Sequence, residues 1–251
     1  MADEIKTKVA LIFGATGGIG RELSRQLAGE GWNLVLAARR PEQLSTLADE
    51  LQAHSLPTDA TNPDEVERCV AGTVARHGRL DAVAHCVGSL LLKAAHRTTD
   101  AEWQHTLRTN LTSAFYVLRA ASQAMQSTGG SIVFVSSGAA QRGLPNHEAI
   151  AAAKAGLIGL ALSGAATYAR CSIRVNCVAP GLVRTPLSEP ITRVESALRY
   201  STSLHALRRI GEPSEVASAI RWLMNPQQNW ITGQVLGVDG GLVNVQPAAA
   251  N

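Results

Sequence analysis

The chain has 251 residues, of which 45% are hydrophobic and 17% charged, so its composition is that of a core-forming globular protein and not a disordered one. Length alone allows one large α/β domain or two smaller domains. The net charge is +3 with no block of like charges, which argues against a nucleic-acid partner. Only 4% of the residues are aromatic, so we expect a core of Ala, Val, Leu and Ile.

The sequence shows no pattern typical of export or membrane insertion. Residues 1–8 carry charges of both signs and run directly into a short apolar stretch, unlike a secretory signal, so we expect a cytoplasmic protein. Segment 149–169 has the length of a membrane span, but it contains Lys154 and much Ala and Gly, and we interpret it as a buried helix. The four cysteines form no Cys-x-x-Cys pair and have no zinc-like spacing with histidine, so we expect reduced thiols and no metal site.

Strand and helix patterns alternate along the chain. The glycine-rich turn at 14–20 follows the first apolar run, and helices are predicted after this turn, after Pro41, and from the caps Asn62 and Thr99. The apolar runs that predict strands are 8–13, 33–38, 55–58, 80–86, 131–136, 173–179 and 235–238. Strands that are apolar throughout and separated by helices indicate an α/β fold, namely a single doubly wound domain over 1–251. Its parallel sheet would have about seven strands, with helices on both faces.

The turn Gly14-Ala-Thr-Gly-Gly-Ile-Gly20 lies directly between a predicted strand and a predicted helix. Glycines there let the backbone turn tightly and approach a pyrophosphate, which the N–H groups and dipole of the helix N-terminus stabilise. Glycine-rich turns also occur in α/β proteins for purely structural reasons. The strand–turn–helix setting nevertheless favours a dinucleotide site.

Several motifs in this order together resemble the short-chain dehydrogenase/reductase family over nearly the whole chain. They are Gly14–Gly20, Asp59 in Pro-Thr-Asp-Ala, Asp81, Asn110 in Thr-Asn-Leu-Thr, Ser136-Ser137, 175–186, 209–216 and 231–241. The resemblance implies a Rossmann domain that binds a nicotinamide dinucleotide, with Asp59 at the adenine and Thr185 at the nicotinamide carboxamide. The cofactor-binding residues that it implies are Gly14, Thr16, Gly18, Ile19, Gly20, Asp59, Gly88, Lys154, Pro180, Gly181 and Thr185.

The end of the second predicted strand indicates which dinucleotide is preferred. Proteins of this fold that use NAD usually carry an acidic residue there, whereas this chain has Ala38 followed by Arg39 and Arg40. A guanidinium can bind a 2′-phosphate through two hydrogen bonds, so we expect Arg39 and Arg40 to bind NADP(H) in preference to NAD(H). The alternative is a solvated arginine pair at the start of a helix.

The resemblance also implies a catalytic Ser, Tyr and Lys, together with an Asn that maintains a water chain. Ser137, Lys154 and Asn110 fall on the matching positions. The Tyr position, four residues before the Lys, holds Ile150, which can neither donate nor accept a proton. The usual mechanism of the family therefore does not apply to this chain as it stands.

His147 is the strongest substitute for the missing proton donor. It lies three residues before Ile150, so on a helix the two would share a face, and imidazole titrates near neutral pH. Enoyl reductases that resemble this family place their tyrosine seven residues before the lysine, as His147 is placed here. The alternatives are a solvent-facing or turn-capping histidine, with Glu148 and Tyr200 as weaker candidates.

A second departure lies at the end of the fourth predicted strand. The family commonly has Asn-Asn-Ala-Gly there, and this chain has His85-Cys86-Val87-Gly88. We expect His85 to pack in the core. Cys86 has no neighbouring cation in the sequence, so we expect a packed thiol and not a reactive thiolate.

The function that these residues favour is an NADP(H)-dependent oxidoreductase. Its substrate would be a small carbonyl or enone-like molecule that contacts Ser137, His147 and Ile150, beneath a lid formed by residues 186–205. The alternative is an NADP(H)-binding protein with impaired catalysis that serves as a sensor or as a partner subunit. Small residues on the long helices at about 103–126 and 147–168 favour a homodimer or homotetramer.

Overall fold

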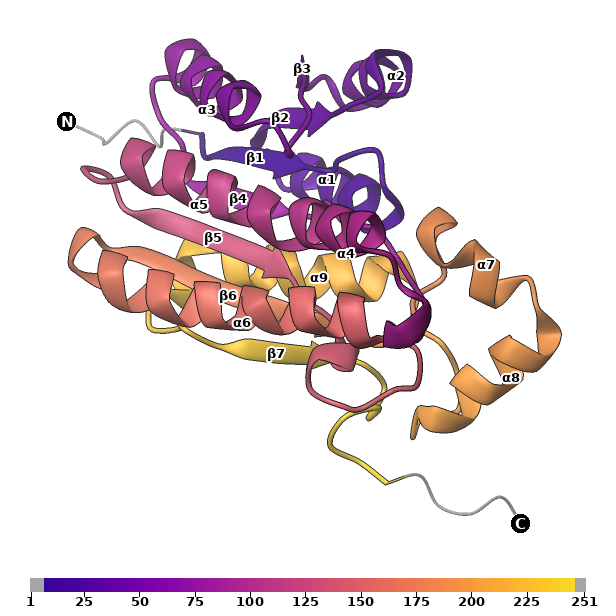
Figure 1. The fold of residues 1–251 in the computed structure, drawn as a ribbon. Helices are drawn as coiled ribbons and strands as arrows, with labels where there is room; N and C mark the ends of the chain where they lie inside the picture. Colours follow the sequence, from indigo (N-terminus) through magenta and orange to yellow (C-terminus); the bar gives the residue numbers. More distant parts are fainter. Residues whose placement is uncertain (1–6, 247–251) are drawn as a thin grey trace.

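The computed structural model describes residues 7–246 and confirms one doubly wound α/β domain (Figure 1). Seven parallel strands pair in the order β3-β2-β1-β4-β5-β6-β7. They are β1 (Val9–Phe13), β2 (Asn33–Ala38), β3 (His54–Pro57), β4 (Ala82–His85), β5 (Gly130–Val135), β6 (Ile173–Pro180) and β7 (Val235–Val238). All seven predicted strands are present, with ends that differ from the prediction by at most two residues.

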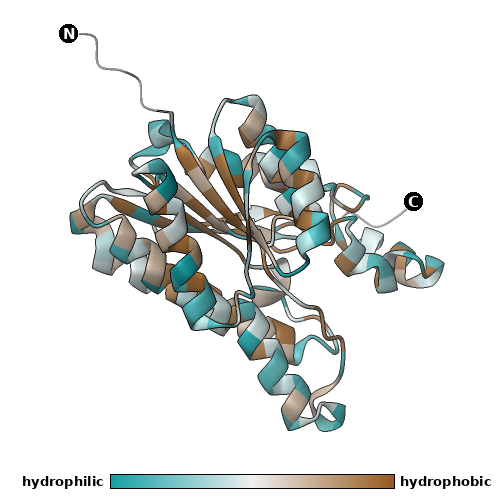
Figure 2. Ribbon diagram, turned by 90° about the horizontal axis from the view of Figure 1, so that it is seen from above, coloured by the Kyte–Doolittle hydropathy of each residue, from teal (hydrophilic) through white to brown (hydrophobic). Residues whose placement is uncertain are grey.

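Helices cover both faces of the sheet, so the central strands are buried on both sides (Figure 2). One face packs against α3 (Pro63–His77), α5 (Ser113–Ala124) and α6 (Glu148–Tyr168). The other packs against α1 (Gly18–Gly29), α2 (Pro41–Leu51) and α9 (Pro213–Met224). Two short helices, α7 (Glu189–Thr192) and α8 (Glu195–Leu204), project beyond the carboxyl ends of the strands (Figure 1).

The predicted helix starts at Asn62 and Thr99 are confirmed by their capping bonds. The Asn62 side chain accepts from the N–H groups of Asp64 and Glu65, and Thr99 forms a reciprocal capping box with Glu102. These bonds satisfy N–H groups that the first turn of a helix leaves without a partner.

The helix predicted over 103–126 is not continuous. It starts at Asp100, and a π-helical segment, Arg108–Thr112, separates α4 (Asp100–Leu107) from α5. Within this segment the side-chain nitrogen of Asn110 donates to the carbonyl oxygen of Thr106, an acceptor that the backbone N–H of an α-helix would use. An inserted π turn of this kind often marks a functional position.

Helix α6 and the turn after it, 148–171, are long and apolar enough to span a membrane by length and composition alone. In the fold this helix instead lies against the sheet and α5. Gly164 lets it approach α5 closely, because a Cβ atom there would lie 3.1 Å from Leu118. The structure therefore explains the apolar character by packing inside the domain.

We expect the outer faces of α5 and α6 to form a contact between copies of the chain. Phe115 and Leu162 are about half exposed there, and the small side chains of Ala152 and Ala155 are exposed beside them. Gly156, by contrast, packs against Leu111 of its own chain. Sedimentation at micromolar concentration should give a dimer or tetramer that Leu162→Arg dissociates, and a monomeric wild type would contradict this expectation.

Candidate functional site

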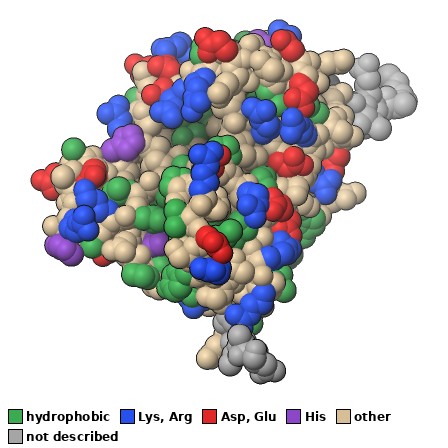
Figure 3. Space-filling view, turned by 90° about the vertical axis from the view of Figure 1, so that its right-hand side faces the viewer, with side chains coloured by type: hydrophobic (Ala, Val, Ile, Leu, Met, Phe, Trp, Pro, Cys, Tyr) green, Lys and Arg blue, Asp and Glu red, His purple; other side chains and the backbone are tan. Residues whose placement is uncertain are grey.

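The carboxyl ends of β1, β4, β5 and β6 meet at one edge of the sheet, where ligands bind in open α/β folds. A cavity of about 550 Å³ lies between this edge and the α7–α8 segment, residues 186–205. Ten of the predicted site residues line it: Ile19, Gly88, Asn110, Ser137, His147, Ile150, Lys154, Pro180, Gly181 and Thr185. Figure 3 looks onto this end of the molecule.

The glycine turn is packed so tightly that Gly14 and Gly20 are sterically required. A Cβ atom on Gly14, where φ is +77°, would lie 2.8 Å from the carbonyl carbon of Cys86, and one on Gly20 would lie 2.3 Å from the oxygen of Gly14. The first turn of α1 has no side-chain cap and no acidic residue. An uncapped helix N-terminus beneath a bare glycine turn fits a pyrophosphate.

The residues predicted to bind the adenosine half lie outside the cavity, at the ends of β2 and β3. Arg39 and Arg40 are exposed, and neither guanidinium has a hydrogen bond or ion pair to residues 7–246. Asp59 accepts hydrogen bonds from the backbone N–H and the hydroxyl of Thr61, which hold its carboxylate in place. Two exposed guanidinium groups without partners fit an additional phosphate.

Lys154 is buried on α6, and its Nζ donates to the carbonyl oxygen of Val135 at 2.7 Å. Burial without a carboxylate partner lowers its pKa to about 8. This cation lies close enough to influence Cys86, which has no charged neighbour in the sequence, but the expectation of an unreactive thiol there is confirmed. Burial still dominates and raises the pKa of the Cys86 thiol to about 12, so the thiol is neutral.

Lys154 is expected to make the stability of the protein depend on pH. Folding lowers its pKa from the usual 10.5 to about 8, so the unfolded chain binds more protons between these values, and the free energy of unfolding rises with pH across that window. The rise is about 3 kcal/mol, at about 1.36 kcal/mol for each pKa unit. Urea unfolding across this window, at fixed protein concentration, should show the rise in the wild type and not in Lys154→Met. Parallel profiles of the free energy of unfolding against pH for the wild type and the variant would contradict this expectation.

Asn110 and the segment after β4 form one hydrogen-bonded wall of the cavity. The Asn110 Oδ1 atom accepts from the backbone N–H of Ser89 at 3.1 Å, and its Nδ2 donates to the Ser89 hydroxyl at 2.9 Å. A Cβ atom on Gly88 would lie 3.1 Å from Asn110 Oδ1 and 3.5 Å from Lys154 Nζ. His85, just before this segment, is fully buried and its Nε2 bonds Ser113 at 2.9 Å, which confirms its place in the core.

Ser137 follows β5 and has an uncommitted hydroxyl proton. Its Oγ accepts from the backbone N–H of Ala139 at 3.2 Å, and its own O–H has no acceptor among residues 7–246. Ile150, 4% exposed, lines the same cavity one helical turn before Lys154. A substrate oxygen in this cavity could therefore accept a proton in a hydrogen bond from Ser137.

His147 lines the cavity, although the helix-face argument that placed it there is wrong. The helix starts at Glu148, and His147 is its N-cap residue, outside the regular helical turn. Its Nδ1 donates to the carbonyl oxygen of Pro145 at 2.8 Å, which fixes the tautomer and leaves Nε2 without a partner among the described residues. Of the weaker candidates, Glu148 accepts from the Ala95 N–H outside the lining, whereas Tyr200 lines the cavity and is 55% exposed.

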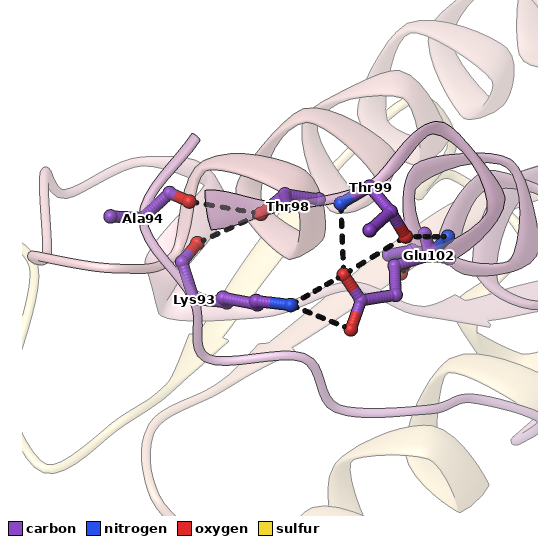
Figure 4. A network of polar contacts seen from close by, with 6 residues as sticks. Lys93, Ala94, Thr98, Thr99 and Glu102 are labelled. Atoms are coloured by element: carbon purple, nitrogen blue, oxygen red, sulfur yellow. Dashed lines mark hydrogen bonds and ion pairs between the residues drawn. The ribbon is translucent and has the colours of Figure 1, made fainter. Parts of the chain in front are cut away.

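A polar network outside the cavity joins Lys93, Thr99 and Glu102 (Figure 4), and Lys93 also bonds the turn that carries His147. Lys93 Nζ contacts both carboxylate oxygens of Glu102, at 2.7 and 2.9 Å, and lowers the pKa of this carboxyl to about 2. The backbone N–H of Lys93 donates to the carbonyl oxygen of Asn146, whose φ is +63°. The segment after β4, the start of α4 and the turn before α6 are thus joined.

His205 is a site residue that sequence reasoning missed. It is 3% exposed, its Nε2 accepts from the backbone N–H of Leu182 at 3.1 Å, and its Nδ1 donates to the carbonyl oxygen of Ser201 at 2.7 Å. It fastens the end of the α7–α8 segment to the loop after β6. A single histidine without a motif gave no signal in the sequence. No cluster of possible metal ligands occurs within residues 7–246.

A doubly wound sheet with a bare glycine turn and a cavity at its carboxyl edge defines a Rossmann-type dinucleotide-binding protein. A family model described as enoyl-(acyl carrier protein) reductase matches residues 14–243. The 3-oxoacyl-[acyl-carrier-protein] reductase FabG of Thermotoga maritima is 34% identical over 247 residues, which cover 95% of this chain and 99% of the relative.

Solved structures agree with the sequence relatives. A short-chain type dehydrogenase/reductase from Mycobacterium ulcerans has a TM-score of 0.90 at 31% identity and covers 96% of this chain and 91% of its own. An actinorhodin polyketide ketoreductase solved with NADPH has a TM-score of 0.90 at 32% identity and covers 95% of this chain and 98% of its own. The chain belongs to the short-chain dehydrogenase/reductase family of oxidoreductases.

Proposed function

We propose that the protein is an NADP(H)-dependent oxidoreductase that acts on a carbonyl or enone-like small molecule and exchanges the proton through His147. The observation that carries this proposal is the meeting of Ser137, Lys154, Asn110 and His147 in one cavity beside the glycine turn. The reductase names of the relatives and the NADPH in a solved relative support it.

The residues at both ends of the site suit this dinucleotide. Gly14, Gly18 and the start of α1 would hold the pyrophosphate, Arg39 and Arg40 the 2′-phosphate, and Lys154 the hydroxyls of the nicotinamide ribose. Bound NADPH would supply the hydride. The lysine, buried without a carboxylate, would gain the polar partners that it lacks in the protein alone.

His147 and Ser137 would act together on the substrate oxygen. The bond from Nδ1 to Pro145 orients the imidazole, so that proton exchange takes place at Nε2. For reduction, the protonated ring donates from Nε2 as negative charge develops on the oxygen, and the Ser137 hydroxyl donates a second hydrogen bond. For oxidation, the neutral ring accepts the proton at the same atom. The α7–α8 segment would close over the substrate as a lid.

Ile150 supports the alternative, a dinucleotide-binding sensor or partner subunit without turnover. Its buried aliphatic side chain stands where the family resemblance implies the tyrosine, and it can transfer no proton. Measuring NADPH binding and NADPH oxidation with a panel of ketones and enones separates the two functions. Oxidation that depends on substrate supports the enzyme, whereas binding without turnover supports the alternative.

NADPH is expected to bind more tightly than NADH because Arg39 can pair with the 2′-phosphate. Hydrogen bonds to charged groups contribute about 1.5–3 kcal/mol, so Arg39→Asp should weaken NADPH binding by roughly ten- to a hundredfold. NADH lacks this phosphate, and its affinity serves as the internal control. Fluorescence titrations that give the wild type equal affinities for both nucleotides would exclude the preference.

A further inference from the structure

The part of the cavity that remains for a substrate is walled by aliphatic side chains from three separate segments. The segment after β4 contributes Leu90 and Leu92, the loop before α6 contributes Leu144, and the α7–α8 segment contributes Leu187, Ile191 and Leu204. Ile150 lines the same cavity. The convergence of these walls from distant parts of the sequence makes an apolar chamber above the strand ends.

No carboxylate or guanidinium from the described residues faces this chamber. Among residues 7–246, the lining contains no Asp, Glu or Arg, and its one lysine, Lys154, is bonded to Val135 at the strand end. The charged residues of the α7–α8 segment pair along their own helical turns, Arg193 with Glu189 and Arg199 with Glu195, each at 2.9 Å. A carboxylate or phosphate that entered would lose its water among aliphatic walls without a guanidinium to pair with.

Several polar side chains of the lining are already satisfied within the protein. The Ser136 hydroxyl donates to the carbonyl oxygen of Lys154, the Ser188 hydroxyl contacts the carbonyl oxygen of Val183, and both ring nitrogens of His205 are bonded. Ser137 and His147 keep an unused position each. The side chains of Asn146, Tyr200 and Ser201 also line the cavity without a hydrogen bond to the described residues.

The mouth of the chamber exposes apolar surface that a ligand can cover. Leu92 is 40% exposed on one side and Leu187 is 51% exposed on the other. In Figure 3 hydrophobic side chains gather around the centre of this end of the molecule, between neighbouring acidic and basic side chains. Removing such surface from water is favourable by about 25 cal/mol for each Å².

From the aliphatic walls and the absence of a guanidinium or carboxylate among the described lining residues, we infer that the substrate is an uncharged, mainly apolar ketone or the corresponding alcohol. Free acids and phosphate esters are rejected by the cost of burying their charge against these walls. This inference rests on the proposed function for the reaction, but it concerns binding and is tested separately from turnover.

A matched pair of ketones provides the test: methyl 4-acetylbenzoate, which is neutral, and 4-acetylbenzoate, which differs by one carboxylate. Calorimetric titration into the complex with NADP⁺ should show the ester binding at least about tenfold more tightly than the acid. Turnover of both with NADPH is measured in parallel. Binding of the ester without turnover would overturn the proposed reaction and leave the substrate class intact.

Placing a guanidinium at the mouth should reverse the preference. Leu187→Arg and, on the opposite side, Leu92→Arg are expected to tighten acid binding by about tenfold and to weaken ester binding. Val194→Arg is the matched control, because Val194 is 50% exposed in the same segment but does not line the cavity. A wild type that binds the acid as tightly as the ester, or that binds neither, overturns the inference, as does a control that changes the preference equally.

Discussion

Replacing His147 with alanine is expected to lower kcat for carbonyl reduction by about 10²- to 10⁴-fold, the usual contribution of one well-placed general acid. The imidazole is held through Nδ1 by Pro145, and Nε2 is the atom left to exchange a proton. The measurement is kcat at saturating NADPH and ketone across the pH range.

His96→Ala is the matched control for this change. His96 is an exposed histidine in the segment before α4, outside the cavity lining, so its loss should leave kcat unchanged. If His147→Ala stays within about twofold of the wild type, His147 does not carry the proton, and Tyr200 becomes the residue to replace next.

Installing tyrosine at position 150 is expected to create or raise carbonyl-reductase activity by about 10²- to 10⁴-fold. The new hydroxyl would lie one helical turn from Lys154, whose charge favours the ionised phenol, and would share the cavity with Ser137. Ile150→Phe is the control because it adds the same ring without the hydroxyl. Turnover of both variants is compared with the wild type.

The pair of variants also separates a lost catalyst from a relocated one. An inert wild type that Ile150→Tyr activates has lost its proton donor, whereas an active wild type that His147→Ala inactivates has moved it. Because the larger ring could block the chamber, NADPH affinity and the thermal midpoint are measured alongside turnover. If Ile150→Tyr keeps normal NADPH affinity and stability but is no more active than Ile150→Phe, the tyrosine hydroxyl has no role there.

Features encoded by neighbouring residues were predictable from the sequence. The caps at Asn62 and Thr99 depend on side chains that bond within three residues, and the glycine turn depends on a steric requirement at its own positions. The strands followed from unbroken apolar runs, which a sheet covered on both faces requires. The same runs also predicted where the strands end, and the cavity lies at those ends.

Features that depend on contacts between distant residues were not predictable. Lys154 influences Cys86 only because the fold brings α6 close to the segment that follows β4, and His205 acquires its role through a bond to Leu182. The position of His147 was predicted from helical periodicity, but the helix starts one residue later, at Glu148. The π segment around Asn110 likewise arises from a side-chain bond that no periodic pattern reveals.

Gly18 and Thr185 lie far apart in the sequence but pack against each other in the fold. A Cβ atom on Gly18 would lie 2.7 Å from the Thr185 methyl group, and Thr185 caps the turn that leads into the α7–α8 segment. A dinucleotide bound at the glycine turn would therefore lie close to the start of that segment. We expect an ordered addition in which the dinucleotide enters first. Each ligand then raises the affinity for the other by the same factor, because the coupling free energy is reciprocal.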